Sequence, residues 1–195
     1  MHIVADSDRQ IVEKVRSGNS RTYALLVDRH KERAMTLALR LLGSKEEAEE
    51  LVQDAFLRAY KNLDTFRGDA KFSTWLYRIL YNLCMTKVTR RKGKMEHLEE
   101  EDRMTKTMLV DDEEISIQER IEHEEITKLV ATEIESLPEK LKTVILLFYV
   151  QDMSYDEMSA VMNIPVGSVK TYLHRGRNML RQRVLSQLKG EVSLT

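Results

Sequence analysis

Apolar residues recur at spacings of three and four through most of the chain, which is the period of an amphipathic α-helix. In the first half, this pattern predicts helices over residues 23–41, 44–62 and 74–91. Gly43 can end the first helix in a left-handed conformation, and Ser73 can cap the third. The N-terminal half is therefore expected to form a three-helix unit.

The second half carries the same period in shorter segments. It predicts a helical face over residues 126–137, a helix that begins with Pro138 and reaches Tyr149, and a short helix over 154–162 opened by a Ser-x-x-Glu capping box. A tight turn and a final basic helix from Val166 follow. A short helix, a tight turn and a basic helix form the layout of a helix-turn-helix.

Residues 94–120 lack this period. The runs Glu99–Asp102 and Asp111–Glu114 are blocks of like charge, which repel each other and favour an extended, solvated chain. We therefore expect an all-α protein with an N-terminal domain (1–93), an acidic flexible linker (94–120) and a C-terminal helix-turn-helix domain (121–195).

Charge is distributed unevenly, although the net charge of the 195 residues is only −1. Residues 58–94 hold ten Lys/Arg against two acidic residues, and residues 95–125 hold thirteen acidic residues against three basic ones. Residues 166–189 hold six Lys/Arg and no acid. Two basic blocks on either side of an acidic one indicate surfaces that bind a polyanion.

Composition excludes several classes of protein. Seven Gly and two Pro are too few for a turn-rich sandwich or barrel. The lone Cys84 excludes an internal disulfide and a cysteine-built zinc site. No apolar run approaches a membrane span, and the first residues do not resemble a signal peptide, so a cytosolic protein is expected.

Enzyme signatures are missing as well. Residues 123–127 begin like a zinc-protease helix, but Thr127 stands where the second histidine is required. No phosphate-binding loop, nucleophile elbow or dinucleotide fingerprint occurs, and His30 lies on an apolar face as a core histidine would. We expect no catalytic residue, no metal site and no cofactor.

Two groups of residues could bind nucleic acid. On the last helix, Lys170, Thr171, His174, Arg175 and Arg177 share one solvent-facing side, as a helix in the major groove requires. In residues 66–91, Phe66, Phe72, Trp75, Tyr77 and Tyr81 alternate with basic residues. Such aromatic rings could stack on unpaired bases or complete a three-helix core, and the pattern favours neither reading.

These segments resemble a known family. The stretch from Phe72 to Ile79, followed by Asn82 and Arg90–Arg91, resembles the promoter-melting segment of extracytoplasmic-function (ECF) sigma factors of bacterial RNA polymerase. Residues 47–56 are similar to the polymerase-binding helix of that family. Residues 137–140, 164–170 and 174–177 resemble its promoter-reading domain, and the motifs occur in the family's order.

The resemblance implies a role for each group of residues. Core polymerase, through the clamp helices of its largest subunits, would contact Glu49, Glu50, Gln53 and Asp54. The minus-ten element, including a flipped base held by the loop after residue 63, would contact Phe66, Arg67, Lys71, Phe72, Ser73, Trp75, Arg78, Asn82, Arg90 and Arg91. The minus-thirty-five element would contact Ser168, Lys170, Thr171, His174, Arg175 and Arg177.

The family further implies that the chain is a monomer when free, that its partners are core polymerase (clamp helices and flap) and promoter DNA, and that an anti-sigma factor, often membrane-anchored, restrains it. Three positions depart from the family pattern. Thr86 stands where Asp is usual, and Leu80 and Gly176 stand where a small Ala is common. Gly176 lies in the recognition helix, where Gly is about 1 kcal/mol less favourable than Ala.

Two other functions remain open at this point. A stand-alone repressor or activator would need only the helix-turn-helix and would bind duplex DNA tightly, usually as a dimer. A helical protein-interaction scaffold would show no salt-dependent DNA affinity.

Overall fold

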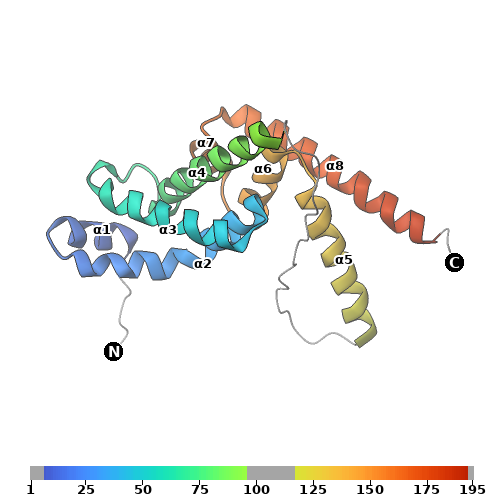
Figure 1. Cartoon of the computed structure of the whole chain (residues 1–195), viewed down its shortest axis with the longest axis horizontal. Helices are drawn as coiled ribbons and strands as arrows, with labels where there is room; N and C mark the ends of the chain where they lie inside the picture. Colours follow the sequence, from blue (N-terminus) through green and yellow to red (C-terminus); the bar gives the residue numbers. More distant parts are fainter. Residues whose placement is uncertain (1–6, 96–116, 193–195) are drawn as a thin grey trace.

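The structure is a computed structural model that describes residues 7–95 and 117–192. All regular elements in these ranges are helical (Figure 1), which confirms the all-α class. The α-helices are α1 (Asp8–Arg16), α2 (Tyr23–Leu42), α3 (Lys45–Lys61), α4 (Phe72–Met95), α5 (Ile117–Glu135), α6 (Glu139–Tyr149), α7 (Tyr155–Met162) and α8 (Val166–Val192). In the described part, no helix combines the length and apolar character needed to cross a bilayer.

Helices α2, α3 and α4 pack together and form the N-terminal unit, with α1 against α2. As predicted, α2 ends at Gly43, whose φ of 70° is left-handed. The Ser44 hydroxyl accepts a hydrogen bond from the Glu47 amide at 3.3 Å, so α3 begins at the predicted cap. The core histidine is also confirmed, because His30 is buried and its Nε2 lies 2.8 Å from Asp8 Oδ2.

Helix α1 and the first residues of α4 and α6 differ from the sequence expectation. Helix α1 was not predicted, because nine residues are too short for a clear period; its signals are the Ser7–Gln10 capping box and the buried Ile11. Helix α4 begins at Phe72 and includes Ser73, because the buried Phe72 ring brings the start of the helix into the core. Pro138 is the N-cap of α6 rather than its first residue.

The C-terminal unit contains the predicted helix-turn-helix. Both bonds of the α7 capping box are present: the Ser154 amide donates to Glu157 Oε2 at 2.8 Å, and the Glu157 amide donates to Ser154 Oγ at 3.3 Å. Asn163 ends α7 in the left-handed region, with φ of 53°. The long helix α8 follows and packs against α5, α6 and α7.

Most of the predicted acidic linker lies outside the described residues. Of the range 94–120, the structure describes the end of α4 through Met95 and the start of α5 from Ile117. Helix α5 therefore begins four residues before the expected second unit at 121.

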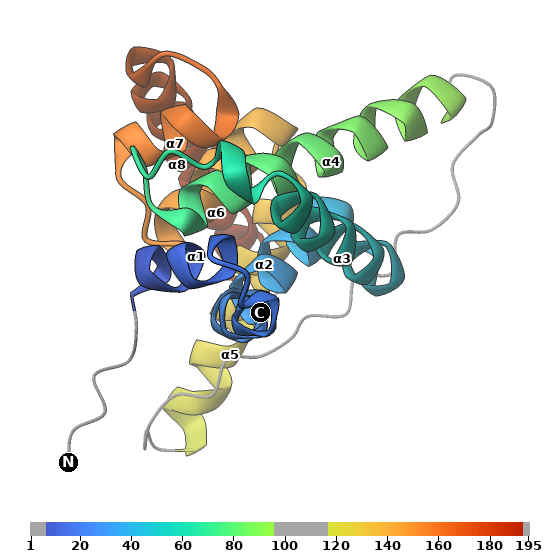
Figure 2. The same cartoon turned by 90° about the vertical axis from the view of Figure 1, so that its left-hand side faces the viewer.

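The two helical units contact each other. Helix α7 packs on α4, and α6 touches α2 (Figures 1 and 2). Lys71 Nζ lies 2.9 Å from Glu157 Oε1, Arg40 pairs with Glu135 at 3.2 Å, and the Gln151 side-chain amide donates to the Arg33 carbonyl at 3.0 Å. The start of α4 is thereby joined to the helix-turn-helix domain.

Candidate nucleic-acid and polymerase interfaces

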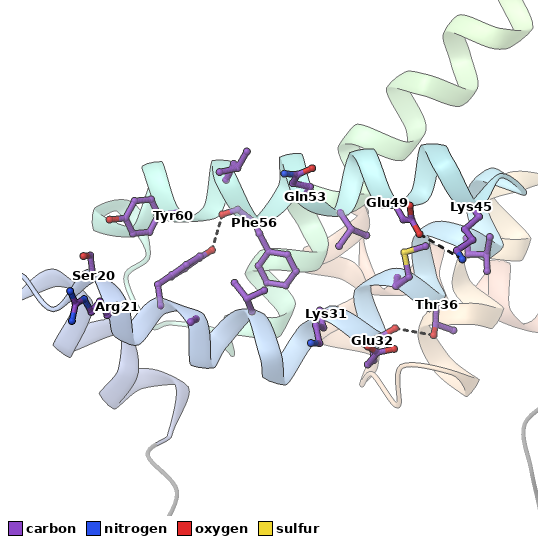
Figure 3. A pocket seen from close by; sticks show the side chains of 17 residues that line it. Ser20, Arg21, Lys31, Glu32, Thr36, Lys45, Glu49, Gln53, Phe56 and Tyr60 are labelled. Carbon is purple, nitrogen blue, oxygen red and sulfur yellow. Dashed lines mark hydrogen bonds and ion pairs between the residues drawn. The ribbon is translucent and has the colours of Figure 1, made fainter.

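The four predicted polymerase-contacting residues lie on two different sides of α3. Glu49 and Gln53 lie on the rim of a groove between α2 and α3 (Figure 3). Glu50 faces α4 instead, with its Oε2 at 3.4 Å from Lys87 Nζ. Asp54 pairs with Arg58 one turn further along the helix. The acidic strip that one helical pattern predicts is therefore divided by the neighbouring helices.

The groove between α2 and α3 encloses about 1000 Å³. Its apolar walls include Tyr23, Val27, Met35, Leu39, Val52, Phe56, Leu57 and Tyr60. The Tyr23 hydroxyl donates to the Phe56 carbonyl at 2.7 Å across it, and desolvation by burial raises the pKa of Tyr23. The groove thus has a fixed, water-poor floor and a charged rim.

The sequence pattern did not reveal this groove, because its walls come from two helices and each pattern describes one helix at a time. A usable signal was present on α3. Leu57 and Tyr60 lie outside its core-facing set and are 51% and 42% exposed. Exposed large apolar side chains of this kind mark interaction surfaces when they are contiguous.

The aromatic residues of the predicted minus-ten segment form a cluster. The Phe66 and Trp75 rings are 5.3 Å apart, and each lies 5.9 Å from the Phe72 ring. Phe66 and Phe72 are only 6% and 2% exposed, so both rings lie in the core of this structure, and their role as minus-ten contacts stays a prediction. They hold the loop onto α4, while Trp75 is half-buried at the surface.

A second hollow lies beside Trp75, between the end of α3 and α4. It encloses about 380 Å³ and is lined by Arg58, Asn62, Thr65, Trp75, Ile79, Asn82, Leu83 and Thr86. The Thr86 hydroxyl donates to the Asn82 carbonyl at 2.8 Å. With Thr86 in place of the family's Asp, the lining contains no carboxylate. An aromatic ring with several amides and hydroxyls suits an uncharged heterocycle.

The basic residues predicted to contact the minus-ten element differ in their exposure and in their ion pairs. Arg67, Arg78 and Arg90 are exposed, as is Asn82. Lys71 is exposed but paired with Glu157, and Arg91 is half-buried, bonded to Glu47 and to the Leu42 carbonyl at 2.9 Å. The interaction of Arg91 joins α4 to the α2–α3 turn, so part of its role is structural.

On α8, the predicted reading residues Lys170, Thr171, His174 and Arg175 are all exposed. Thr171 Oγ1 donates to the Gly167 carbonyl at 2.9 Å, and Ser168 is half-buried in the first turn. Arg177 is placed differently. Its guanidinium carbon lies 4.9 Å from the Phe148 ring centre and 5.3 Å from that of Tyr149, a cation–π position against α6.

Gly176 is a packing position. A Cβ there would lie 3.2 Å from Ile145 Cγ1, so the glycine lets α8 approach α6 closely. Among the described residues, no group of three His, Cys, Asp or Glu side chains could hold a metal ion. The described part of the chain thus offers three candidate binding surfaces, which are the groove between α2 and α3, the hollow between α3 and α4, and the basic face of α8.

A helix-turn-helix with a basic exposed face, preceded by a second helical unit with an apolar groove, defines a two-domain DNA-binding protein. Residues 26–94 match the family model for sigma-70 region 2, and residues 127–180 match that for sigma-70 region 4. The chain is 36% identical over 177 residues to the ECF RNA polymerase sigma factor SigW of Bacillus subtilis, covering 89% of this chain and 94% of that protein. It is 34% identical over 184 residues to the ECF RNA polymerase sigma-E factor of Escherichia coli K12, covering 91% and 94%. The chain belongs to the ECF sigma factor family.

Solved structures show the same fold. CnrH, in complex with the cytosolic domain of CnrY, matches with a TM-score of 0.66 at 26% identity, over 93% of this chain and 99% of that one. The sigma factor RpoE from Bartonella quintana, in complex with the anti-sigma factor NepR, matches with a TM-score of 0.68 at 18% identity, over 83% and 96%. The resemblance stated from the motifs is confirmed, and a sigma factor is favoured over a stand-alone repressor or activator.

Proposed function

We propose that this sigma factor uses three separate surfaces to start transcription. The groove side of α3 binds core RNA polymerase, the hollow between α3 and α4 binds the unpaired minus-ten strand, and the exposed face of α8 reads the minus-thirty-five element. The observation that carries the proposal is the hollow, where Trp75, Asn62 and Asn82 converge.

The polymerase surface is an apolar groove with a charged rim. Glu49, Gln53, Lys31 and Glu32 line that rim, above walls that include Val27 and Phe56 (Figure 3). A helix of the polymerase clamp could bury its apolar face in such a groove while its polar residues meet the rim. Glu50 and Asp54, on the other side of α3, would meet basic residues of the same partner.

The minus-ten surface suits a base that has left the duplex. A volume of about 380 Å³ is at the lower end of the range of small-ligand sites, about 300–1,000 Å³. Trp75 offers a ring for stacking, and the Asn62 and Asn82 amides offer donors and acceptors. Base stacking on an aromatic ring contributes about 1–3 kcal/mol, enough to offset part of the cost of unstacking.

The minus-thirty-five surface is the α8 face with Lys170, Thr171, His174 and Arg175. An arginine can pair with two acceptors of guanine, and lysine can neutralise phosphate. The half-buried Ser168 lies in the first turn of the helix, where backbone amides favour a phosphate.

The proposal divides the chain at residues 93 and 120, with the polymerase and minus-ten surfaces in residues 1–93 and the minus-thirty-five surface in 121–195. Two weak DNA contacts suffice when both are tethered to one polymerase, because each raises the effective concentration of the other. An anti-sigma factor would be a further partner, as NepR is for the sigma factor RpoE from Bartonella quintana in their solved complex. The chain would act at the nucleoid, without cofactor or catalysis of its own, or be held at the inner membrane by that factor.

The test is transcription with purified core polymerase on genomic DNA of the source organism, followed by sequencing of the transcripts. We expect initiation at a small set of sites that share two spaced elements. Arg175→Ala should lower initiation at least tenfold, whereas the matched control Arg181→Ala, further along the same helix, should change it little. Tight binding of promoter duplex by a dimer without polymerase would contradict the proposal and favour a repressor.

A further inference from the structure

Arg58 has no assigned role, yet it is the one charged side chain among the residues that line the hollow. It lies near the end of α3, and its side chain is 55% exposed. The other polar lining residues, such as Asn62 and Thr65, are neutral. A guanidinium at the rim of a base-sized hollow is suited to a phosphate of the strand whose base enters it, because it can bind two phosphate oxygens at once.

In this structure the guanidinium of Arg58 is held by a carboxylate. Arg58 Nε lies 3.0 Å from Asp54 Oδ1 and 3.1 Å from Oδ2, and one terminal nitrogen lies 2.9 Å from Oδ2. The acid precedes the base by four residues on the same helix, which is the favourable order for such a pair. Pairs of this kind are weak when exposed, so a competing partner can replace either member.

Asp54 is also a predicted polymerase contact, although it lies on the side of α3 away from the groove. The two functions of α3 thus meet in one ion pair, with Asp54 as a polymerase contact and Arg58 at the hollow. We infer that Arg58 binds a phosphate of the unpaired minus-ten strand, and that Asp54 withholds it until a basic group of the polymerase takes the Asp54 carboxylate. The inference rests on the proposed function, and it makes polymerase binding and strand binding mutually supporting.

The free full-length chain allows a direct test with a fluorescein-labelled, 12-nucleotide single-stranded DNA of mixed sequence. Asp54→Asn releases Arg58, so we expect the affinity to rise about twofold to fivefold and the salt slope to steepen by about 0.7, the value for one more phosphate contact on a single strand. In the double variant Asp54→Asn/Arg58→Gln this gain in affinity should be absent. Arg58→Gln alone should change the affinity of the free chain little, because Asp54 already holds Arg58 there.

Glu13→Gln is the matched control. It removes the same charge from a similar exposed pair on α1, where Arg9 Nε lies 3.6 Å from Glu13 Oε1, and α1 contributes no residue to the hollow. An equal rise in affinity for Glu13→Gln and Asp54→Asn would overturn the inference, because net charge alone would explain it. A gain that persists in Asp54→Asn/Arg58→Gln, or no gain at all, would overturn it as well.

A second measurement tests the coupling with saturating core polymerase, after subtraction of DNA binding by the core alone. The ratio of affinities of wild type and Arg58→Gln should grow about threefold or more when polymerase is added. An unchanged ratio with normal polymerase binding overturns the coupling and leaves the proposed function intact. If the wild-type chain fails to bind polymerase, the proposed function fails instead. The comparison of the single and double variants of Asp54 and Arg58 on the free chain still reports whether Asp54 withholds Arg58.

Discussion

Burial determines what similar side chains do in this protein. Phe72 and Trp75 lie three residues apart on α4, yet the first is a core residue and the second faces the hollow. Arg175 and Arg177 are both exposed on α8, yet of the two only Arg177 also stacks on the rings of α6. At this scale, the neighbouring helix determines which contacts a side chain makes within the protein.

Cys84 is completely buried, and desolvation raises its pKa from 9.0 to about 12. The native thiol therefore stays protonated at pH 8, whereas the unfolded thiol begins to ionise near pH 9, so this residue's contribution to stability is present at neutral pH and is lost as the pH rises from 9 toward 12. Iodoacetamide at pH 8 should alkylate the native protein at least 100-fold more slowly than the urea-unfolded protein. Comparable rates would mean that the thiol is accessible in the fold.

Gly176 is expected to tolerate alanine and reject larger residues. Alanine gains about 1 kcal/mol of helix propensity but places its Cβ 3.2 Å from Ile145 Cγ1, so the two effects should nearly cancel in urea unfolding. Gly176→Val overpacks the same contact and should cost about 1–3 kcal/mol. A Cβ added at Gly167 in α8 would meet nothing within 4 Å, so Gly167→Val is the control for a valine that overpacks no contact. If both valine variants are equally stable, the α6–α8 contact does not limit the residue size.

At the scale of elements, α3 is the central helix of the N-terminal unit. Its buried residues pack against α2 and α4, while its exposed sides contribute to the groove and to the hollow. One helix therefore keeps the polymerase surface and the strand surface in a fixed relation. The attachment of α4 to this helix depends in part on Arg91, which bonds Glu47 of α3 and the Leu42 carbonyl of α2.

The adjacent arginines Arg90 and Arg91 should separate DNA binding from stability. Arg91→Ala leaves the Leu42 carbonyl without this donor and the half-buried Glu47 carboxylate with only the more distant Lys87 at 3.8 Å, so we expect a loss of about 1–2 kcal/mol in urea unfolding. Arg90→Ala should leave stability within about 0.5 kcal/mol but reduce the salt slope of promoter binding by the polymerase complex by about one phosphate. The reverse result, with Arg90→Ala destabilising and Arg91→Ala neutral, would contradict this division.

For the whole molecule, the packing of α7 on α4 is the main determinant of its shape (Figure 2). Lys71, a predicted minus-ten contact, pairs with Glu157 of the helix-turn-helix domain at 2.9 Å. The amide oxygen of the buried Gln151 has no hydrogen-bond partner among the described residues, so separation of the domains would let water satisfy it. The packed arrangement thus includes polar contacts that can be exchanged for water, polymerase or DNA, beside a buried apolar cluster that contains residues of both units.

Glu157→Gln should loosen this arrangement without damaging α7. Glutamine keeps an oxygen that can accept from the Ser154 amide, but it removes the charge that pairs with Lys71. Because Lys71 is largely exposed, the ion pair contributes at most about 1 kcal/mol, so the ratio of open to packed molecules should rise by up to about fivefold. Small-angle scattering should show a larger radius of gyration at low salt.

Asp28→Asn is the control for that experiment, since Asp28 pairs with Lys31 of its own helix at 3.3 Å and joins no two domains. A radius that changes equally in both variants, or in neither, would show that the Lys71–Glu157 pair does not hold the domains together.

Most helices, several of their caps and the family could be predicted from the sequence. The left-handed Gly43, the N-cap at Ser44, the capping box at Ser154 and the three-four apolar period are local features, and local hydrogen bonds and steric limits are sufficient to specify them. The basic face of α8 was predictable for the same reason, because a helix places residues three and four apart on one side.

The groove, the hollow and the ion-pair partners of individual side chains could not be predicted from the sequence, because they depend on how the helices pack. The walls of the groove come from α2 and α3, and those of the hollow from α3 and α4, so no single helical pattern contains either surface. The packing of Phe66, Phe72 and Arg91 against other parts of the fold likewise depends on residues distant in the sequence. Local spacing specifies one helix at a time, whereas a binding surface is formed by side chains that only packing brings together.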